Sequence, residues 1–380
     1  MKSILSDPAY RHKFINPHTR VLMDLNHPSH FHFFREFILT ARKKQVIFFI
    51  TVRNRKYLAE LLEADDIPYI LKGRRSKTLA GKFLRLFREI FQLFGLAWQV
   101  KPDVFISFAS PYAAIAGKLS GIPVITFDDT ECDRLLHLIY PRFTDLILTP
   151  QCFQKSFGPK HLRFKGYKES AYLSERNLLR SPGLKTSLGL NKNEPYILVR
   201  FVAHRATHEF GREKLSDSHK IHIIRFLNQY HKVLISSEGE LPAALRPYEP
   251  DIPVYWMHQV LEEATLFFGE SATMAAEAVL LGTPAIFIED TSRGFTEELE
   301  KNTGMLNRFT VKMLDQALHK ATELLTARQT DTENQPGINP SPSYQTTRIL
   351  YLLTWLIDDP VRNIRYLIKY PRHMEQYKAR

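Results

Sequence analysis

The chain has 380 residues, of which 52 are lysine or arginine and 40 are aspartate or glutamate, so its net charge is +12. At roughly 150 residues per domain this length predicts two domains, and a hydrophobic content of 44% excludes a disordered chain. Two cysteines are too few for a disulfide framework, the first residues lack the apolar segment of a secretory signal, and no uncharged apolar stretch approaches the ~20 residues of a membrane-spanning helix. We therefore expect a cytoplasmic protein, either soluble or peripheral on the inner face of the cell membrane.

After a polar, basic extension at 1–19, the first half of the sequence alternates between short apolar runs and longer helical stretches. Runs without polar alternation, separated by helices, are typical of a parallel sheet covered on both faces. The expected strands are 20–25, 46–52, 67–71, 104–108, 122–127 and 146–149, and the expected helices are about 31–44, 54–65, 77–99, 111–120 and 131–140. These elements predict an N-terminal Rossmann-like domain over 20–165.

A second alternating set follows a linker at 166–195, which has no strong apolar run. Its expected strands are 196–202, 231–237, 265–269 and 285–289, and its expected helices are about 216–230 and 271–281. They predict a C-terminal Rossmann-like domain over 196–327, followed by a mobile polar loop at 328–346 and basic helices at 347–380. The fold class is therefore α/β, with two doubly wound domains that face a central cleft.

In an open α/β sheet, ligands bind at the carboxyl ends of the strands, so the loops there hold the candidate site residues. The loop after the first strand contains His27, His30 and His32, whose imidazoles could act as acid or base or could contact phosphate. The alternative is that one of them caps the next helix and another packs inside the domain. Asp128, which starts the loop after strand 122–127 beside two more acids, could take an acid or base role or could help to cap the next helix.

In the second domain, His204 and Arg205 follow strand 196–202, where an arginine could grip phosphate oxygens; a solvated loop is the alternative. Glu238 and Gly239 follow strand 231–237 in the same way. No neighbouring residues complete a set of metal ligands around any of the histidines.

The strongest pattern lies at 269–284, where a strand ends at a glycine and Ser271, Ala272 and Thr273 open a helix. The N–H groups and the dipole of such a helix start can hold a diphosphate. Glu277, further along the helix, can accept two hydrogen bonds from a ribose diol. Many strand–helix–strand units carry small residues at this turn, so the pattern by itself is moderately specific.

This segment resembles the nucleotide-sugar site of GT-B glycosyltransferases and of the non-hydrolysing UDP-N-acetylglucosamine 2-epimerases. In those families a Ser-Gly-Gly-type turn binds the diphosphate, and a glutamate six residues after the serine binds the uridine ribose, which implies these roles for Ser271, Ala272, Thr273 and Glu277. The later run EDTSR resembles the Asp-Thr-Thr-Glu-Arg run of the epimerases and makes Arg293 a binding candidate. The HR pair after strand 196–202 similarly resembles their His-Arg pair.

Over about 20–310 the chain resembles the family called domain of unknown function 354, through the motifs DLNHPSHFHFF, SPYAA, FDDTE, GYKESAYL, RFVA, SSEGELP and GESATMAAEAVLLGTPAI in that order. The resemblance implies a GT-B fold, in which a C-terminal helical segment crosses back onto the first domain, and it supplies no reaction. Ala109-Ser110 stands where the epimerases carry an acidic residue, and Ala272-Thr273 replaces their Gly-Gly. Because epimerisation needs an acid or base to move the proton at C2, the first departure disfavours that reaction.

Two basic stretches suggest a function for part of the net positive charge. Segment 77–98 has a broad apolar stripe with Lys82, Arg85 and Arg88 along its other side, and segment 348–369 repeats the pattern with Arg362, Arg365 and Lys369. Such helices can lie in the interface of an anionic membrane, and the alternative is a core helix with a solvated basic face. No nucleic-acid-binding motif is found, so nucleic acid is not an expected partner.

We therefore expect a GT-B-type glycosyltransferase that moves a sugar from a nucleotide sugar, UDP-linked by resemblance, to an envelope or membrane-associated glycan or lipid-linked acceptor on the N-terminal domain. The alternatives are a UDP-sugar 2-epimerase and a non-catalytic module that binds nucleotide sugar or membrane. Catalytic candidates are His27, His30, Asp128 and His204, and nucleotide-sugar-binding candidates are Arg205, Glu238, Gly239, Ser271, Ala272, Thr273, Glu277 and Arg293. We expect no metal and no cofactor besides the nucleotide-sugar substrate.

Overall fold

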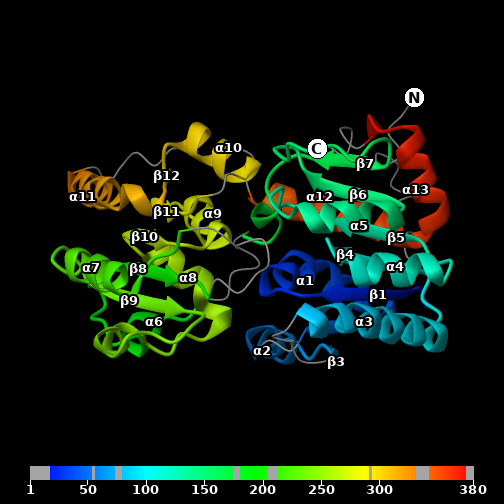
Figure 1. Cartoon of the computed structure of the whole chain (residues 1–380), viewed down its shortest axis with the longest axis horizontal. Helices are drawn as coiled ribbons and strands as arrows, with labels where there is room; N and C mark the ends of the chain where they lie inside the picture. The colour runs from blue at the N-terminus through cyan, green and yellow to red at the C-terminus, as the bar shows by residue number, and fades with distance from the viewer. Residues whose placement is uncertain are drawn as a thin grey trace. The chain divides into compact units, whose positions relative to one another are not determined.

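The computed structural model describes residues 18–53, 56–72, 79–173, 180–203, 213–290, 293–330 and 342–373. The chain divides into two compact units, one made of Met1–Tyr172 with Pro342–Arg380 and the other of Leu173–Ser341 (Figure 1). Each unit contains one sheet of parallel strands with helices packed against it, so the predicted α/β class with two doubly wound units is confirmed. The expected extension at 1–19 lies almost entirely outside the described residues.

The first sheet has the strand order β3-β2-β1-β4-β5-β6-β7, and its neighbouring strands are parallel. Its strands are β1 (Arg20–Leu25), β2 (Ile47–Arg53), β3 (Ile70–Lys72), β4 (Val104–Phe108), β5 (Val124–Phe127), β6 (Leu146–Pro150) and β7 (His161–Phe164). Because β4, β5 and β6 are buried along their whole length, their sequences are continuous apolar runs. The strand expected at 67–71 begins later, since Pro68 has no N–H to donate to the ladder.

The helices of this unit are α1 (Pro28–Arg42), α2 (Lys56–Ala64), α3 (Leu79–Val100), α4 (Pro111–Leu119), α5 (Arg134–Phe143), α12 (Pro342–Asp358) and α13 (Pro360–Lys369), with a short 3-10 turn η3 (Glu169–Ala171). α1 packs against α2 and α12, whereas α3, α4 and α5 pack side by side in that order (Figure 1). The rings of Phe33 and Phe34 on α1 contact Phe108 and Phe127, the last residues of β4 and β5, at centroid distances of 5.0–5.7 Å. This packing holds the first turns of α1 against the carboxyl ends of those strands.

The second sheet has the order β12-β11-β10-β8-β9 and is also parallel. Its strands are β8 (Tyr196–Phe201), β9 (Lys232–Ser237), β10 (Leu266–Gly269), β11 (Ala285–Ile288) and β12 (Leu306–Phe309). The helices of this unit are α6 (Leu184–Ser187), α7 (Asp217–Leu227), α8 (Met257–Glu263), α9 (Ala272–Leu280), α10 (Gly294–Thr303) and α11 (Leu314–Thr330). Three 3-10 turns complete the unit: η5 (Ala243–Tyr248), η6 (Val254–Trp256) and η7 (Val311–Met313). Helices extend into the loop expected at 328–346, and its residues 331–341 lie outside the described part of the chain.

In each sheet the direction of winding reverses between two neighbouring strands, β1 and β4 in the first sheet and β8 and β10 in the second. At such a point the loops that follow the two strands turn away from each other, and the space between them is where open α/β sheets bind ligands. The fold therefore directs attention to the loops after β1 and β4 and to those after β8 and β10.

Candidate functional site

At the reversal point of the first sheet, Asp24 on β1 is completely buried and is surrounded by donors. Ser110 Oγ donates to its carboxylate at 2.6 Å, Thr51 Oγ1 at 2.9 Å and Asn26 Nδ2 at 3.0 Å. The ammonium of Lys72, itself only 4% exposed, forms an ion pair with the same carboxylate. Because the donors lie on or just after strands β1, β2, β3 and β4, this one side chain ties together four strand ends.

The electrostatics and the backbone mark this cluster as an organised site. Burial alone would raise the pKa of Asp24, but the charge and hydrogen bond of Lys72, helped by Ser110 and Asn26, lower it below its ordinary value. Lys72 Nζ also donates to Asn26 Oδ1 at 3.1 Å, so the ion pair positions the loop after β1. In the loop after β4, Ala109 has a φ of 39°, in the left-handed region that residues with a Cβ rarely adopt. Strain of this kind is concentrated at functional sites.

His27 lies in the loop after β1, whereas His30 and His32 lie in the first turns of α1, and each of the three has a local contact. His27 is the N-cap of α1, and its Nδ1 accepts a hydrogen bond from the Ser29 N–H at 3.2 Å. The ring of His30 stacks on Phe108 at a centroid distance of 4.6 Å, and its Nδ1 accepts from the Asn26 N–H at 3.4 Å. His32 stacks on Tyr172 at 5.5 Å. With Nδ1 accepting, a neutral His27 or His30 carries its proton on Nε2 and presents a donor.

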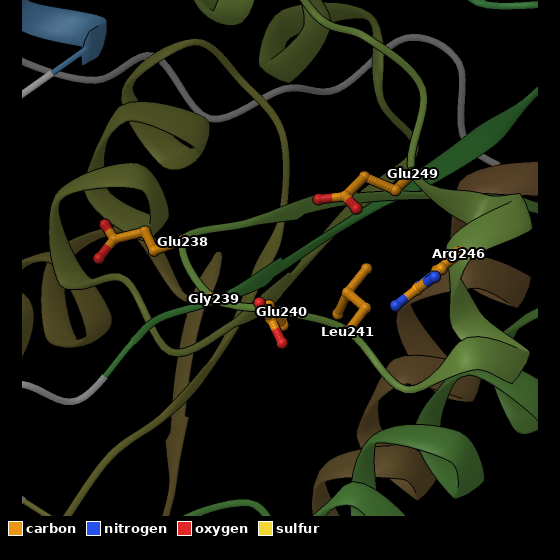
Figure 2. Close-up of a pocket in the computed structure, with 6 residues that line it drawn as sticks. All are labelled: Glu238, Gly239, Glu240, Leu241, Arg246 and Glu249. Atoms are coloured by element: carbon orange, nitrogen blue, oxygen red, sulfur yellow. The ribbon is translucent and has the colours of Figure 1, made fainter.

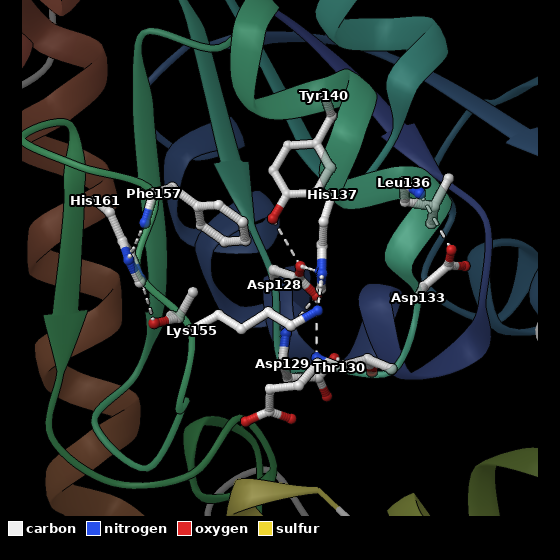
Figure 3. Close-up of polar contacts among 12 residues, drawn as sticks. Asp128, Asp129, Thr130, Asp133, Leu136, His137, Tyr140, Lys155, Phe157 and His161 are labelled. Atoms are coloured by element: carbon white, nitrogen blue, oxygen red, sulfur yellow. Dashed lines mark hydrogen bonds and ion pairs between the residues drawn. The ribbon is translucent and has the colours of Figure 1, made fainter.

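Asp128, directly after β5, is 2% exposed and accepts four hydrogen bonds (Figure 3). Tyr140 Oη donates at 2.7 Å and His137 Nε2 at 2.9 Å, both from α5, while the N–H groups of residues 129 and 130 donate at 2.8 and 3.0 Å. Lys155 Nζ lies 3.0 Å from His137 Nδ1, which completes a chain from Lys155 through His137 to Asp128 (Figure 3). Burial, reinforced by Asp128, raises the pKa of Tyr140, so the phenol remains a donor.

A second buried ion cluster adjoins the same loop. Lys168, 4% exposed, forms ion pairs with Asp129 and, at 3.2 Å, with Glu169. Burial alone would lower the pKa of Lys168, but the two carboxylates together raise it above its ordinary value. Lys168 therefore keeps its charge at neutral pH, and its ion pairs fasten the loop after β5 to the segment around η3.

In the second unit, Ser271 is the N-cap of α9, and its hydroxyl accepts from the Met274 N–H at 3.3 Å. Ala272 and Thr273 form the first turn of the helix directly after β10. Gly269, the last residue of β10, lies so close to the neighbouring strand that an added Cβ would be 2.5 Å from the backbone oxygen of Arg200. The glycine thus lets β8 and β10 approach closely at the reversal point, so the backbone of Arg200 lies beside the strand end that leads into α9.

Arg200 is held in place by two polar contacts. Its guanidinium donates to Ser236 Oγ at 2.6 Å and to Glu238 Oε1 at 2.8 Å, both at the end of β9. Ser237 Oγ donates to the Gly239 carbonyl at 2.9 Å, which shapes the turn that follows. Glu238 and Gly239 also line a surface hollow of about 470 Å³ together with Glu240, Leu241, Arg246 and Glu249 (Figure 2).

Glu277 lies on the buried side of α9 with 4% exposure, and its Oε1 is 3.4 Å from His258 Nε2 on α8. Arg293, the N-cap residue of α10, forms a two-pronged ion pair with Glu289, including a contact of 3.0 Å between Nη2 and Oε1. His204 and Arg205 lie outside the described residues. Of the expected binding residues in this unit, the sheet therefore brings those after β10 next to Arg200, while Arg293 follows the more distant β11.

Several participants are not predictable from local motifs. Lys72, His137 and Lys155 gain their roles from partners that lie 9 to 48 residues away. A signal was present for Asp24, because a carboxylate inside the apolar run RVLMDL must find a partner when it is buried. Among the described residues, no group of three or more His, Cys, Asp or Glu side chains is arranged to hold a metal ion.

Similar structures have the same fold. The UDP-GlcNAc 2-epimerase from Neisseria meningitidis, solved with UDP-GlcNAc, superposes with a TM-score of 0.65 at 14% identity, covering 92% of this chain and 100% of that one. The UDP-GlcNAc 2-epimerase from Methanocaldococcus jannaschii, in complex with UDP-GlcNAc and UDP, gives 0.63 at 15% identity over 89% and 100%. The spinosyn forosaminyltransferase SpnP gives 0.53 at 13% identity over 93% and 100%. These likenesses establish a GT-B-like fold.

Sequence comparison identifies the family. An uncharacterised protein of Methanocaldococcus jannaschii, MJ0665, is 25% identical over 281 residues, which is 70% of this chain and 80% of that protein. The family described as "Protein of unknown function (DUF354)" matches residues 19–291, which include the candidate residues up to Glu277. The chain belongs to the DUF354 family.

Proposed function

We propose that the protein is a glycosyltransferase that takes a sugar from a nucleotide-sugar donor bound on the second unit and transfers it to an envelope or membrane-associated glycan acceptor. The observation that carries the proposal is the start of α9, where Ser271 caps a helix that begins directly after β10, beside Arg200 on β8. The helix dipole and an arginine together favour a diphosphate. Structures of the same fold that hold UDP-GlcNAc or UDP support a donor of this class.

The donor contacts follow from the positions of the side chains on and near α9. Thr273 and the first-turn N–H groups would bind the diphosphate, and Glu277 would accept hydrogen bonds from the ribose. Arg200 and Arg293 already hold Glu238 and Glu289, so a diphosphate would have to share or displace these carboxylates. Glu238, with a 36% exposed side chain, is the easier of the two to displace. Arg205 and His204 remain candidates on sequence grounds.

The acceptor-activating group is proposed to lie in the first unit. In their neutral forms His27 and His30 carry the proton on Nε2 and would donate it to a hydroxyl or phosphate oxygen; either ring could take the acceptor's proton only in the tautomer with Nε2 unprotonated. Asp128 is an alternative base, and its contact with His137 holds the carboxylate in place. His27→Gln, His30→Gln and Asp128→Asn separate these roles, because replacement of the true base should lower kcat with little change in the donor's binding constant.

Calorimetry with a panel of UDP-, GDP- and CMP-linked sugars tests donor binding, and the melting temperature should rise with the correct donor. Glu277→Ala should weaken that donor by ~1–3 kcal/mol, because a ribose diol would lose its acceptor. Glu323→Ala, which removes an exposed carboxylate from α11, is the matched control and should bind as the wild type does. Absence of binding by the wild type, or unchanged binding by Glu277→Ala, would refute the proposal.

A UDP-sugar 2-epimerase is the second candidate, favoured by the Glu289–Arg293 pair in the run that resembles the epimerases. Incubation of the donor in heavy water without an acceptor separates the two reactions, since only epimerisation introduces deuterium at C2. Donor binding without turnover against any glycan or lipid-linked acceptor would instead indicate a non-catalytic binding module.

A further inference from the structure

Helices α3, α4 and α5 carry large apolar side chains on their outward sides. On α3, Phe87, Phe91 and Trp98 are 44%, 67% and 77% exposed. Leu119 at the end of α4 is 63% exposed, and Leu135 and Leu138 on α5 are 60% and 57% exposed. Because the three helices pack side by side (Figure 1), we treat these six residues as one surface, the α3–α5 face. Contiguous exposed apolar surfaces on soluble proteins commonly mark interaction sites.

The fold does not need these six side chains. A separate set of residues on the inward sides of the same helices packs against the sheet, including Leu93 and Ala97 on α3, Ala113 on α4 and Tyr140 on α5. A helix with one buried apolar side normally has a polar opposite side. Here the outer side of α3 also carries apolar side chains, and the rings of Phe91 and Trp98 are largely exposed.

Among the described residues, the exposed charges on these three helices are positive. The sequences of α3, α4 and α5 contain a single acidic residue, Glu89, which is 2% exposed and lies 3.7 Å from Lys72. Arg88, Arg134 and Arg142 are exposed on α3 and α5. Lys118 on α4 lies 3.6 Å from Asp145, so the three arginines carry the electrostatic argument. The face thus combines aromatic and aliphatic side chains with cations and lacks exposed carboxylates on its helices.

We propose that the α3–α5 face docks on the surface of an anionic phospholipid bilayer, with Phe91 and Trp98 inserted at the level of the headgroups. A membrane-surface helix needs an apolar side for the acyl boundary and cations for the anionic headgroups, and this face supplies both. Within the described residues, no helix is long and apolar enough to cross a membrane, so attachment would be peripheral. The inference does not depend on the proposed reaction, since it concerns a surface outside the strand ends.

Flotation of the full chain with phosphatidylcholine vesicles, with and without phosphatidylglycerol and without any nucleotide, tests the proposal. The wild type should bind the anionic vesicles and should be released by salt. The double variant Phe91→Ser/Trp98→Ser should lose binding. Arg88→Gln and Arg134→Gln should each weaken it about fivefold. Tyr57→Ser/Tyr351→Ser removes two exposed aromatic residues from α2 and α12 and, as the matched control, should bind normally.

Wild-type protein that stays off anionic vesicles, or double-serine protein that binds them as well as the wild type, would overturn the proposal. Sedimentation tests the alternative partner, a second copy of this chain. If the wild type is a dimer that does not bind vesicles and the double-serine variant is a monomer, the face serves self-association. If the double-serine variant melts at a lower temperature than the wild type, the two arginine variants decide instead. Unchanged vesicle affinity in both of them would then count against the bilayer.

Discussion

Replacement of Lys72 by methionine perturbs the candidate site of the first unit at its centre. The substitution keeps a long side chain but removes the cation that neutralises Asp24, which is completely buried. Three hydrogen-bond donors to the carboxylate remain, from Ser110, Thr51 and Asn26. Because breaking a buried ion pair by removing one partner leaves an uncompensated charge, we expect Lys72→Met to lower the free energy of unfolding by about 3–5 kcal/mol at pH 7.

The pH dependence gives the sharper test. In the wild type the pKa of Asp24 is below its ordinary 3.8, so the ion pair contributes stability above that pH and loses it as the pH falls. In Lys72→Met, burial is no longer opposed by the lysine, so the folded-state pKa should lie above the unfolded value. The variant should therefore become more stable relative to the wild type as the pH falls from 7 towards 4.

Urea denaturation followed by fluorescence at several pH values measures both effects. Asp24→Asn/Lys72→Met should recover part of the loss, since it removes the buried Asp24 charge but leaves the buried carboxylate of Glu89, which lies 3.7 Å from Lys72 in the wild type. A cost below about 1 kcal/mol for Lys72→Met, or a cost that does not shrink with falling pH, would contradict the assigned role of the pair. A double variant as unstable as the sum of its single variants would do the same.

Three further predictions concern other parts of the structure. Gly269→Ala places a Cβ 2.5 Å from the Arg200 carbonyl and should lower the free energy of unfolding by ~1–3 kcal/mol, measured by urea denaturation. Burial, with Arg163 nearby, lowers the pKa of His161 from 6.5 to about 4. The unfolded chain therefore gains a proton first as the pH falls, and about 3 kcal/mol of stability should disappear between those pH values. His161→Gln should remove this pH dependence of the stability. Tyr140→Phe deletes the phenol that donates to Asp128 and should cost ~1–3 kcal/mol, read from the melting temperature.

Matched controls belong to each of these measurements. Gly183→Ala, whose added Cβ meets no atom within 4 Å, should melt close to the wild type, and an equal effect of both glycine variants would count against the contact with Arg200. An acid slope that persists in His161→Gln would show that other groups cause it. Tyr255→Phe removes the hydroxyl of a 40% exposed tyrosine and should be nearly neutral.

Most of the strands of the two sheets could be predicted from the sequence, because buried parallel strands have uninterrupted apolar sequences. The expected strand 104–108 matches β4, and the expected strand 146–149 matches β6 except for its last residue. Two of the four edge strands were not predicted: β7 (HLRF) and β12 (LNRF) are short and half polar, and they pair because a neighbouring strand already offers a ladder. The start of a helix could be predicted where a small polar residue caps it, as Ser271 does for α9.

Only part of the candidate site could be predicted from the sequence. Sequence reasoning located the loops after β1, β5, β8 and β10, since ligand sites in such sheets lie at strand ends. It did not find that Lys72 neutralises Asp24 or that His137 joins Asp128 to Lys155, because residues far apart in sequence meet only when the strand order is known. It also left open what the histidines do, and the structure gives His27 a capping contact and His30 a stacking contact.

By itself the sequence determined the fold class, the presence of two α/β units and the small-residue turn at the start of α9, because each depends on residues close together along the chain. The tertiary structure decided which strand lies beside which, and therefore which charges meet and where the winding reverses. It also decided the direction of the aromatic residues on α3. The pattern at 77–98 shows a helix with too many apolar residues for one face, and only the packed neighbours reveal that Phe91 and Trp98 point outward.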